Sequence, residues 1–350
     1  MRVVVFGATG NAGTSVLPAL AGDPAVDEIV GVARRRPKAA FPKVTWAAAD
    51  VTGDDLVPIV AGADVVVHLA WRIQPSHDER VLHDTNVGGS ERILAAVAAA
   101  RVPALVYASS VGAYSPGPKH VPVGESWPTN GIPTSFYARH KAIVERLLDR
   151  FEAEHPQTRV VRLRLALIFK REAGAEVARL FFGPLVPRTL LRRRLLPVVP
   201  GNGQLVFQAV HSLDVGEAYR LAVVGDVRGA FNIAADPVLD PPTLARTLGT
   251  RVLPVPPPVL RAAAAVTWRL RLQPTPPGWV DLAHTAPVMS TERARKELGW
   301  RPRFGADEAL LDLLEGLHRR AGLDTPPLHP DRGGPVLQTR VPQPIERSVT

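Results

Sequence analysis

Short apolar runs recur through the first 165 residues and limit the folds that this chain can adopt. They cover residues 2–6, 28–33, 44–49, 64–70, 104–109 and 159–165. Runs that are continuously apolar, and do not alternate with polar residues, are typical of strands buried on both faces of a parallel sheet. Amphipathic or alanine-rich segments at 11–22, 53–61, 78–100 and 134–154 predict helices between them. The alternation predicts an α/β fold of the Rossmann type, with a doubly wound parallel sheet.

After residue 165 this regular alternation ends, and we expect a dinucleotide-binding domain at 1–169 and a smaller C-terminal α/β substrate lobe at 170–323. Within the lobe, strands are expected at 205–211 and 229–235, and residues 205–235 are expected to return in part to the Rossmann side. Ser212 is the expected cap of a helix over 212–224. Dense prolines predict a disordered tail at 324–350.

Composition excludes several kinds of site. The chain has no cysteine, which excludes disulfides, thiolate zinc sites and a cysteine nucleophile, and its ten histidines do not form a metal-binding motif. The apolar run at the N-terminus is too short for a signal peptide. No window approaches the roughly 18–20 apolar residues of a membrane span. We therefore expect a cytoplasmic protein without a metal and without stable membrane insertion.

The net charge of +9 is carried mostly by arginine. These arginines are scattered through the chain and do not form a patch interleaved with aromatic residues, so a nucleic-acid partner is not predicted. One dense cluster with helical spacing comprises Arg188, Arg192, Arg193 and Arg194. It is interpreted as a solvated face, and contact with an anionic substrate group or a membrane surface is the alternative.

A glycine array follows the first predicted strand and opens the first predicted helix. Gly7 permits a tight turn, Gly10 lets the backbone approach a pyrophosphate, and Gly13 allows close packing of the helix on the sheet. The free N–H groups and the dipole of the helix N-terminus favour phosphate there. The array predicts a dinucleotide site whose contacts are Gly7, Thr9, Gly10, Asn11, Ala12 and Gly13.

The end of the second predicted strand indicates which dinucleotide binds. Ala33 stands where an NAD site usually carries an acidic residue, and Arg34 and Arg35 follow it. Guanidinium groups suit a 2′-phosphate, so NADP(H) is predicted over NAD(H). Ordinary surface arginines are the alternative interpretation.

Further cofactor contacts are expected after the third and fourth strands. Asp50 would accept a hydrogen bond from the adenine amino group, and Val51 would pack against the adenine ring. The end of the fourth strand, at Leu69, Ala70 and Trp71, would let the backbone come close to the cofactor.

Eight stretches, in order along roughly residues 1–320, resemble the extended short-chain dehydrogenase/reductase family, which includes NAD-dependent epimerases and dehydratases. They are GATGNAG (7–13), DVVVHLA (64–70), NVGGSERILAAV (86–97), VYASSVGAY (106–114), YARHK (137–141), RLALIF (164–169), VHSLDV (210–215) and ARKELGWRPR (294–303). The resemblance implies a Rossmann domain with a C-terminal substrate lobe. In relatives, the helices expected here at 78–100 and 134–154 often pair, so a homodimer is an option by analogy.

The same resemblance assigns catalytic roles. Tyr137 would be the general acid/base, Lys141 would lower the pKa of Tyr137 and bind the nicotinamide ribose, and Ser110 would position the substrate carbonyl. Ser109 is the less favoured neighbour of Ser110, and Asn86 matches a family asparagine near the active site. Residues four apart on a helix share a face, so Tyr137 and Lys141 can act together.

The chain departs from the sugar-nucleotide epimerases of this family at several positions. Phe207 stands where an arginine would bind the substrate diphosphate, and Gln208 replaces an acidic residue. Lys170 replaces a glycine. His140 is a separate case, because it replaces a serine often seen in the reductase-like relatives; it is expected to face solvent, and a polar group near the pocket is the alternative. The departures from the epimerases point away from a sugar nucleotide. These departures predict an NADP(H)-dependent reductase of a ketone or aldehyde, small or apolar. The alternatives are a sugar-nucleotide epimerase or dehydratase, and a non-catalytic NADP(H)-binding regulatory protein.

Overall fold

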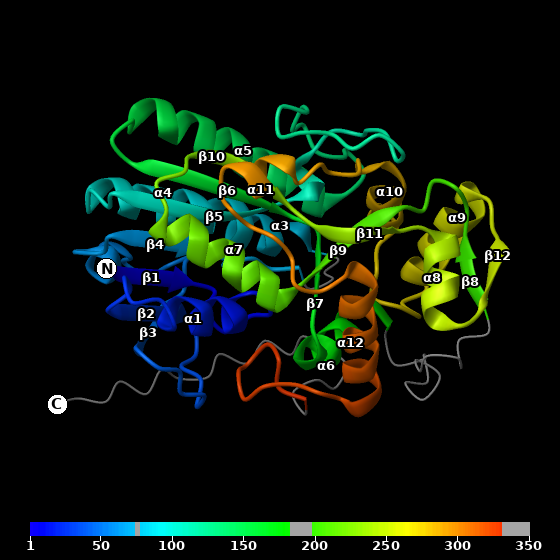
Figure 1. Cartoon of the computed structure of the whole chain (residues 1–350), viewed down its shortest axis with the longest axis horizontal. Coiled ribbons are helices and arrows are strands. Elements are labelled where there is room, and N and C mark those ends of the chain that lie inside the picture. The colour runs from blue at the N-terminus through cyan, green and yellow to red at the C-terminus, as the bar shows by residue number, and fades with distance from the viewer. Residues whose placement is uncertain (74–77, 183–197, 331–350) are drawn as a thin grey trace.

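A parallel sheet of seven strands forms the centre of the molecule. The computed structural model describes residues 1–73, 78–182 and 198–330. The strand order is β10-β6-β5-β4-β1-β2-β3, and every neighbouring pair is parallel. All six predicted strands of the first domain form, and the predicted Rossmann-type α/β fold is confirmed (Figure 1). The strands are β1 (Arg2–Phe6), β2 (Glu28–Ala33), β3 (Val44–Ala48), β4 (Val65–His68), β5 (Ala104–Ser110), β6 (Arg159–Leu165) and β10 (Gly229–Ile233).

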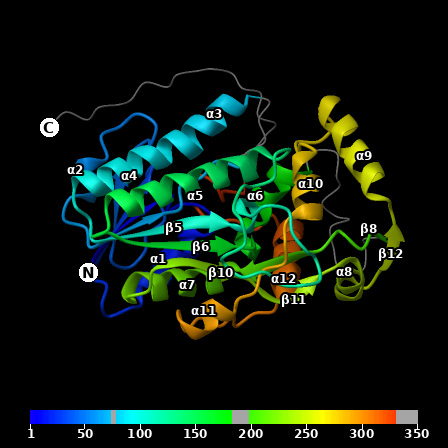
Figure 2. The same cartoon turned by 90° about the horizontal axis from the view of Figure 1, so that it is seen from above.

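Helices cover both faces of this sheet (Figure 2). One face carries α3 (Glu79–His83), α4 (Gly89–Ala99) and α5 (Phe136–Glu154), and the other carries α1 (Gly13–Ala21) and α7 (Ser212–Val224). Two predicted helices differ in detail. The helix expected at 78–100 is divided by one wider turn, η1 (Asp84–Gly88), and the helix expected at 53–61 is reduced to α2 (Val57–Val60).

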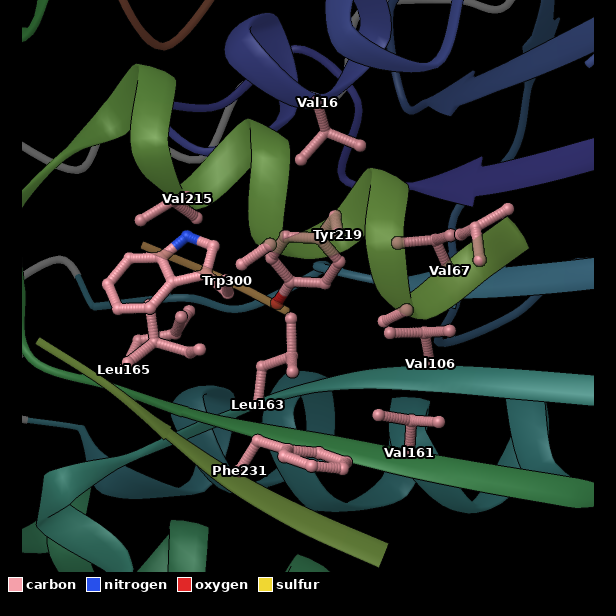
Figure 3. Packing of buried hydrophobic residues seen from close by; sticks show 14 of the residues in the cluster. Val16, Val67, Val106, Val161, Leu163, Leu165, Val215, Tyr219, Phe231 and Trp300 are labelled. Atoms are coloured by element: carbon pink, nitrogen blue, oxygen red, sulfur yellow. The ribbon is translucent and has the colours of Figure 1, made fainter. Parts of the chain in front are cut away.

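The largest core cluster lies between the sheet and the helices α1 and α7 (Figure 3). Trp300, Tyr219 and Phe231 are fully buried there among aliphatic side chains of β5 and β6. The Trp300 indole N–H donates to the Asp214 carbonyl oxygen at 2.8 Å, which joins the LGW stretch near the C-terminus to α7. The C-terminal part of the chain therefore completes the core of the nucleotide half.

The start of α7 differs from the prediction. His211, and not Ser212, is the N-cap, and its Nδ1 accepts the Leu213 N–H at 3.2 Å. Ser212 lies inside the first turn, and its hydroxyl instead donates to the Asn11 carbonyl oxygen at 3.0 Å. The serine thus ties α7 to the glycine loop, a contact that a local capping rule does not include.

The C-terminal lobe is built on two small sheets. One has the order β11-β9-β7, and the other pairs β12 with β8. Figure 1 shows α8, α9, β8 and β12 together at the end of the molecule away from β1 to β3. The elements are η3 (Arg171–Ala173), α6 (Gly174–Val177), η4 (Ala178–Phe182), β7 (Leu167–Phe169), β8 (Val198–Gly201), β9 (Phe207–His211), β11 (Ala235–Leu239), α8 (Pro241–Leu248), β12 (Arg251–Pro254), α9 (Pro257–Arg269), α10 (Gly278–Thr285), α11 (Glu292–Lys296) and α12 (Ala306–Arg319).

The segment after α12 is ordered further than predicted. The expected tail begins at residue 324, yet Thr325 and Leu328 are buried. The Thr325 hydroxyl donates to the Thr9 carbonyl oxygen at 2.9 Å, so this segment packs against the glycine loop. Residues 331–350 and the arginine cluster at 188–194 lie outside the described residues. No helix of the described part of the chain is both long and apolar enough to cross a bilayer.

Candidate active site

The glycine loop between β1 and α1 has the shape that a dinucleotide requires. A Cβ on Gly7, whose φ is +77°, would lie 2.6 Å from the Ala70 backbone nitrogen, and a Cβ on Gly13 would lie 2.5 Å from the Ala8 carbonyl oxygen. Gly10 differs, because the nearest atom to its Cβ would be the Gly7 carbonyl oxygen at 3.6 Å. Gly7 and Gly13 therefore allow close packing, while Gly10 leaves open space for a pyrophosphate. These residues fit the predicted cofactor.

A buried lysine supports this loop from behind. The Lys170 ammonium donates to the Asn11 carbonyl oxygen at 2.9 Å and to the hydroxyls of Thr14 and Ser15 at 2.6 Å and 3.2 Å. Burial lowers the pKa of Lys170 to about 8. Sequence analysis noted only that Lys170 replaces a glycine and assigned it no contact. The replacement of a glycine by lysine could have indicated this contact, because it places a cation at the N-terminus of α1, beside the predicted phosphate site.

Arginines from two segments of the chain lie at the end of the predicted cofactor site expected to bind the adenosine half. Arg34 is exposed at the end of β2, and its charge acts on both Asp50 and Arg72. The pKa of Arg72 is lowered, first by burial and then by Arg34. Arg72 was missed because it follows β4, far from Arg34 in the sequence. Arg35 is exposed next to Arg34, and Val51 is buried.

Asn86 shapes the turn after β4. Its side-chain oxygen accepts the Arg72 N–H at 2.7 Å, and its side-chain nitrogen donates to the Arg72 carbonyl oxygen at 3.0 Å. The Oδ1 and Nδ2 atoms of Asn86 thus both bind the backbone of Arg72. Asn86 thereby positions the segment Leu69–Arg72, which includes the predicted cofactor contacts Ala70 and Trp71.

The structure distinguishes the two neighbouring serines at the end of β5. The Ser109 hydroxyl donates to Oε1 of Glu145 at 2.6 Å, inside the protein. The Ser110 hydroxyl instead accepts the Gly112 N–H at 3.0 Å and interacts with the Tyr137 side chain. Only Ser110 is therefore in contact with the predicted acid/base.

Tyr137 and Lys141 lie on the first turns of α5, which begins at Phe136 because Ser135 caps it. The Lys141 ammonium donates to the Ala108 carbonyl oxygen at 2.6 Å and to the Tyr107 hydroxyl at 3.3 Å. It also lies 3.5 Å from the centre of the Trp71 ring, a cation–π contact.

The electrostatics of this pair differ from the prediction that Lys141 lowers the pKa of Tyr137. Burial raises the pKa of Tyr137 to about 12, and the interaction with the Ser110 side chain opposes this only in part. Burial also holds the pKa of Lys141 well below its usual value, against the charge of Glu145. Desolvation dominates because Lys141 is buried and Tyr137 is partly buried, and the raised pKa keeps Tyr137 protonated at neutral pH.

Aromatic side chains surround Tyr137. Trp279, on α10 of the C-terminal lobe, lies with its ring centre 5.0 Å from that of Tyr137 and 5.4 Å from that of Phe181. Trp71 meets Tyr137 from the nucleotide half, with ring centres 6.0 Å apart. Both halves of the chain therefore contribute an indole to the surroundings of the tyrosine.

His140 does not face solvent as predicted. Its side chain is 4% exposed and its ring meets the rings of His83 and Phe136, at 5.4 Å and 5.9 Å between centres. Burial, followed by the charges of His83 and Arg139, lowers the pKa of His140 to about 4. The prediction failed because α3 packs over this face of α5.

The side chains of Phe207 and Gln208 make packing and hydrogen-bond contacts inside the protein. Phe207 packs against an apolar cluster that includes Leu239 and Leu244. The Gln208 amide exchanges two hydrogen bonds with the Met289 backbone, at 2.7 Å and 3.1 Å. Neither side chain offers the charge that the family's arginine and acidic residue provide.

Comparison with known proteins agrees with this architecture. An uncharacterized protein of Mycobacterium tuberculosis is 28% identical over 326 residues, which cover 92% of this chain and 31% of that protein. This chain thus spans less than a third of the length of that relative. UDP-glucose 4-epimerase 2 of Oryza sativa is 25% identical over 269 residues, covering 71% of this chain and 62% of the rice protein.

Solved structures share the fold. MoeE5 in complex with UDP-glucuronic acid and NAD has a TM-score of 0.65 at 20% identity, with 91% of this chain and 99% of that chain covered. UDP-glucose 4-epimerase of Thermotoga maritima with UDP-glucose has a TM-score of 0.67 at 19% identity, with 91% and 99% covered. Residues 3–234 match the family model described as the NAD dependent epimerase/dehydratase family. The chain belongs to this family, as the resemblance in its sequence implies.

Proposed function

We propose that this chain transfers hydride between a nicotinamide dinucleotide and the sugar of a sugar nucleotide, as an epimerase or dehydratase. The arrangement of Ser110, Tyr137 and Lys141 beside the glycine loop carries this proposal. Membership of the family and the likeness to the rice UDP-glucose 4-epimerase support a sugar nucleotide as substrate.

The chain's own residues supply binding and proton transfer. The open side of Gly10 and the N-terminus of α1 would hold the pyrophosphate, and Lys141 would hold the nicotinamide ribose. When bound, the cofactor supplies the site that accepts or returns a hydride. Tyr137 moves the proton on the substrate oxygen, and Ser110 orients that oxygen by a hydrogen bond. The indoles of Trp71 and Trp279 exclude water around the tyrosine.

A second candidate is the NADP(H)-dependent reduction of a ketone or aldehyde. Three observations favour it. Phe207 lies in an apolar cluster where a diphosphate-binding arginine is expected, and the aromatic groups around Tyr137 suit an apolar substrate. The raised pKa of Tyr137 keeps it protonated, as the donor in a reduction must be.

The substrate assay separates the two candidates. The protein is incubated with UDP-glucose or dTDP-glucose and catalytic amounts of NAD or of NADP, and the sugar is followed by NMR. A changed sugar without net loss or gain of reduced cofactor supports the epimerase or dehydratase. A panel of ketones and aldehydes with NADPH tests the reductase by loss of cofactor absorbance. Turnover of the ketones alone would refute the first candidate, and tight cofactor binding without any turnover would refute both.

The two serines provide a matched test of the catalytic assignment. Ser110→Ala should lower kcat by about tenfold or more, because the substrate oxygen loses a hydrogen-bond donor. Ser109→Ala should leave kcat nearly unchanged, because its hydroxyl bonds Glu145 inside the protein. Tyr137→Phe should reduce kcat by about 10²–10⁴-fold. Equal loss in the two alanine variants would contradict the assignment of Ser110.

The preference between NADP(H) and NAD(H) can be tested by a binding measurement, which does not require enzymatic activity. We propose a preference for NADP(H), with Arg34 and Arg72 flanking the 2′-phosphate and Arg35 assisting. Thermal-shift titration should then show a larger stabilisation by NADPH than by NADH. Arg34→Ala and Arg72→Ala should each reduce this difference, and Arg150→Ala, on an exposed part of α5, should not. Equal shifts for the two cofactors would refute the preference.

A further inference from the structure

The helix α9 buries none of its thirteen residues, although it is rich in apolar side chains. Val259 and Val266 are each 55% exposed, and Leu270, directly after the helix, is 63% exposed. With Ala263, these residues follow the spacing i, i+4, i+7 and i+11, which places them along one face of the helix. Leu272, 43% exposed, extends this apolar stripe into the following turn.

The stripe points away from the protein because the other face of α9 contacts the lobe. Leu260, Ala264 and Trp268 are half-buried on that other face. The Gln273 side chain donates to the Ala264 carbonyl oxygen at 3.3 Å, which folds the following turn back on the helix. Figures 1 and 2 both show α9 at the outer edge of the molecule, remote from β1 to β3.

Within residues 241–280, which include α9, every charged residue is basic. Residues 241–280 contain no aspartate or glutamate and include five arginines, which are Arg246, Arg251, Arg261, Arg269 and Arg271. Arg261 pairs with Asp281 at 2.8 Å. Arg269 and Arg271 flank the exposed Leu270 and form no ion pair within residues 1–73, 78–182 and 198–330. The aliphatic stripe is thus bordered by two arginines with which no carboxylate of the described residues pairs.

We propose that α9 and the turn after it, residues 257–272, dock on the surface of an anionic lipid bilayer. The aliphatic stripe would enter the headgroup region, and Arg269 and Arg271 would bind anionic headgroups. A second copy of the chain fits less well, because an isologous contact would bring these arginines together. Nucleic acid fits less well because exposed aliphatic side chains add nothing to phosphate binding. This association is peripheral and independent of the proposed reaction.

The test is sedimentation of the full chain with lipid vesicles. One vesicle contains phosphatidylcholine alone, and the other contains phosphatidylcholine and phosphatidylglycerol in equal parts. We expect binding to the mixed vesicles that weakens as salt is added, and at least about tenfold weaker binding to the neutral vesicles, since each basic residue near an anionic surface contributes separately.

Variants separate the apolar and the charged contributions. Val266→Ser with Leu270→Ser, and Arg269→Glu with Arg271→Glu, should each weaken partitioning by about tenfold or more. The matched controls are Val57→Ser with Val121→Ser, at residues 38% and 66% exposed, and Arg150→Glu with Arg301→Glu. The controls should partition as the unchanged protein does. Circular dichroism checks that every variant is folded.

Several results would overturn the proposal. It fails if the protein binds neither vesicle, binds both equally, or if the α9 variants partition like their controls. Salt-sensitive binding to DNA that is lost in the arginine variants, without vesicle binding, would assign the surface to nucleic acid. A dimer that dissociates in the Val266→Ser, Leu270→Ser variant, again without vesicle binding, would assign it to a second copy.

Discussion

The helices α7 and α9 are each thirteen residues long and differ completely in burial. Eight residues of α7 are buried, and none of α9. The reason is the neighbour that each helix meets. In α7, Gly216 lets the backbone approach α1, where an added Cβ would lie 2.5 Å from the Ser15 carbonyl oxygen. Within the described residues no comparable approach holds α9, and its apolar residues are exposed. Apolar composition alone therefore does not decide burial.

The largest expected effect concerns the buried charges of the nucleotide half. Glu145 is fully buried and pairs with Arg162 and Arg164 at 2.9 Å and 3.0 Å. Glu145→Gln leaves Arg164 without its anion and removes one of the carboxylates that pair with Arg162, which also pairs with Asp149 and Glu152, so the free energy of unfolding should fall by about 3–5 kcal/mol. Denaturant unfolding measures this. Glu292→Gln, which breaks the exposed pair with Lys296, is the matched control and should cost less than about 1 kcal/mol. If Glu145→Gln and Glu292→Gln lowered the free energy of unfolding by similar amounts, burial would not determine how much an ion pair contributes to stability in this protein.

A second experiment compares the two helices directly. Gly216→Val forces α7 away from α1 and should cost about 3 kcal/mol or more, because the nearest atoms belong to backbone that cannot rotate away. Ala263→Val on the exposed face of α9 should change the free energy of unfolding by about 0.5 kcal/mol or less. If Gly216→Val and Ala263→Val changed the free energy of unfolding equally little, α7 would not pack as closely against α1 as the structure shows.

Acid should destabilise the nucleotide half through its buried histidines. Burial, followed by the charge of Lys141, lowers the pKa of His68 to about 3. Burial first also lowers the pKa of His140, to about 4. The unfolded chain therefore binds more protons than the folded chain below about pH 6.5, so stability is complete above that pH and declines as the pH falls toward 4.

His140→Gln removes one of these groups and should lessen the loss of stability between pH 6.5 and 4, by on the order of 1 kcal/mol. Melting temperature against pH measures the effect. His120→Gln, at an exposed position, is the control and should leave the curve unchanged. A curve that is also unchanged in His140→Gln would show that His140 titrates normally in the folded protein.

The smallest expected effect is on α9. Val266→Ser should alter the free energy of unfolding by no more than about 0.5 kcal/mol, since this side chain is 55% exposed. Val223→Ser in α7, where the side chain is 1% exposed, should cost about 1–3 kcal/mol. A large loss in Val266→Ser would mean that the α9 stripe is covered within the folded chain.

Sequence reasoning succeeded where local pattern and fold were directly linked. The strands, the order of the motifs and the glycine loop followed from apolar runs and glycine spacing, because burial in a parallel sheet leaves a periodic signal. It failed at His140, because a helical position next to a lysine carries no information about the packing of α3. It also assigned no contact to Lys170 and Arg72, whose partners come from segments far away in the sequence.

By itself, the sequence determined the Rossmann-type sheet, the family and the residue types Ser, Tyr and Lys of the proposed active site. The sequence already favoured Ser110 over Ser109 by resemblance, and the tertiary structure adds the physical reason, since packing turns Ser109 toward Glu145 and Ser110 toward Tyr137. It also decided that burial, and not the lysine, dominates the pKa of Tyr137, and that the apolar face of α9 remains exposed. Propensity and periodicity act along a few turns of chain, whereas desolvation depends on every segment that packs around a group.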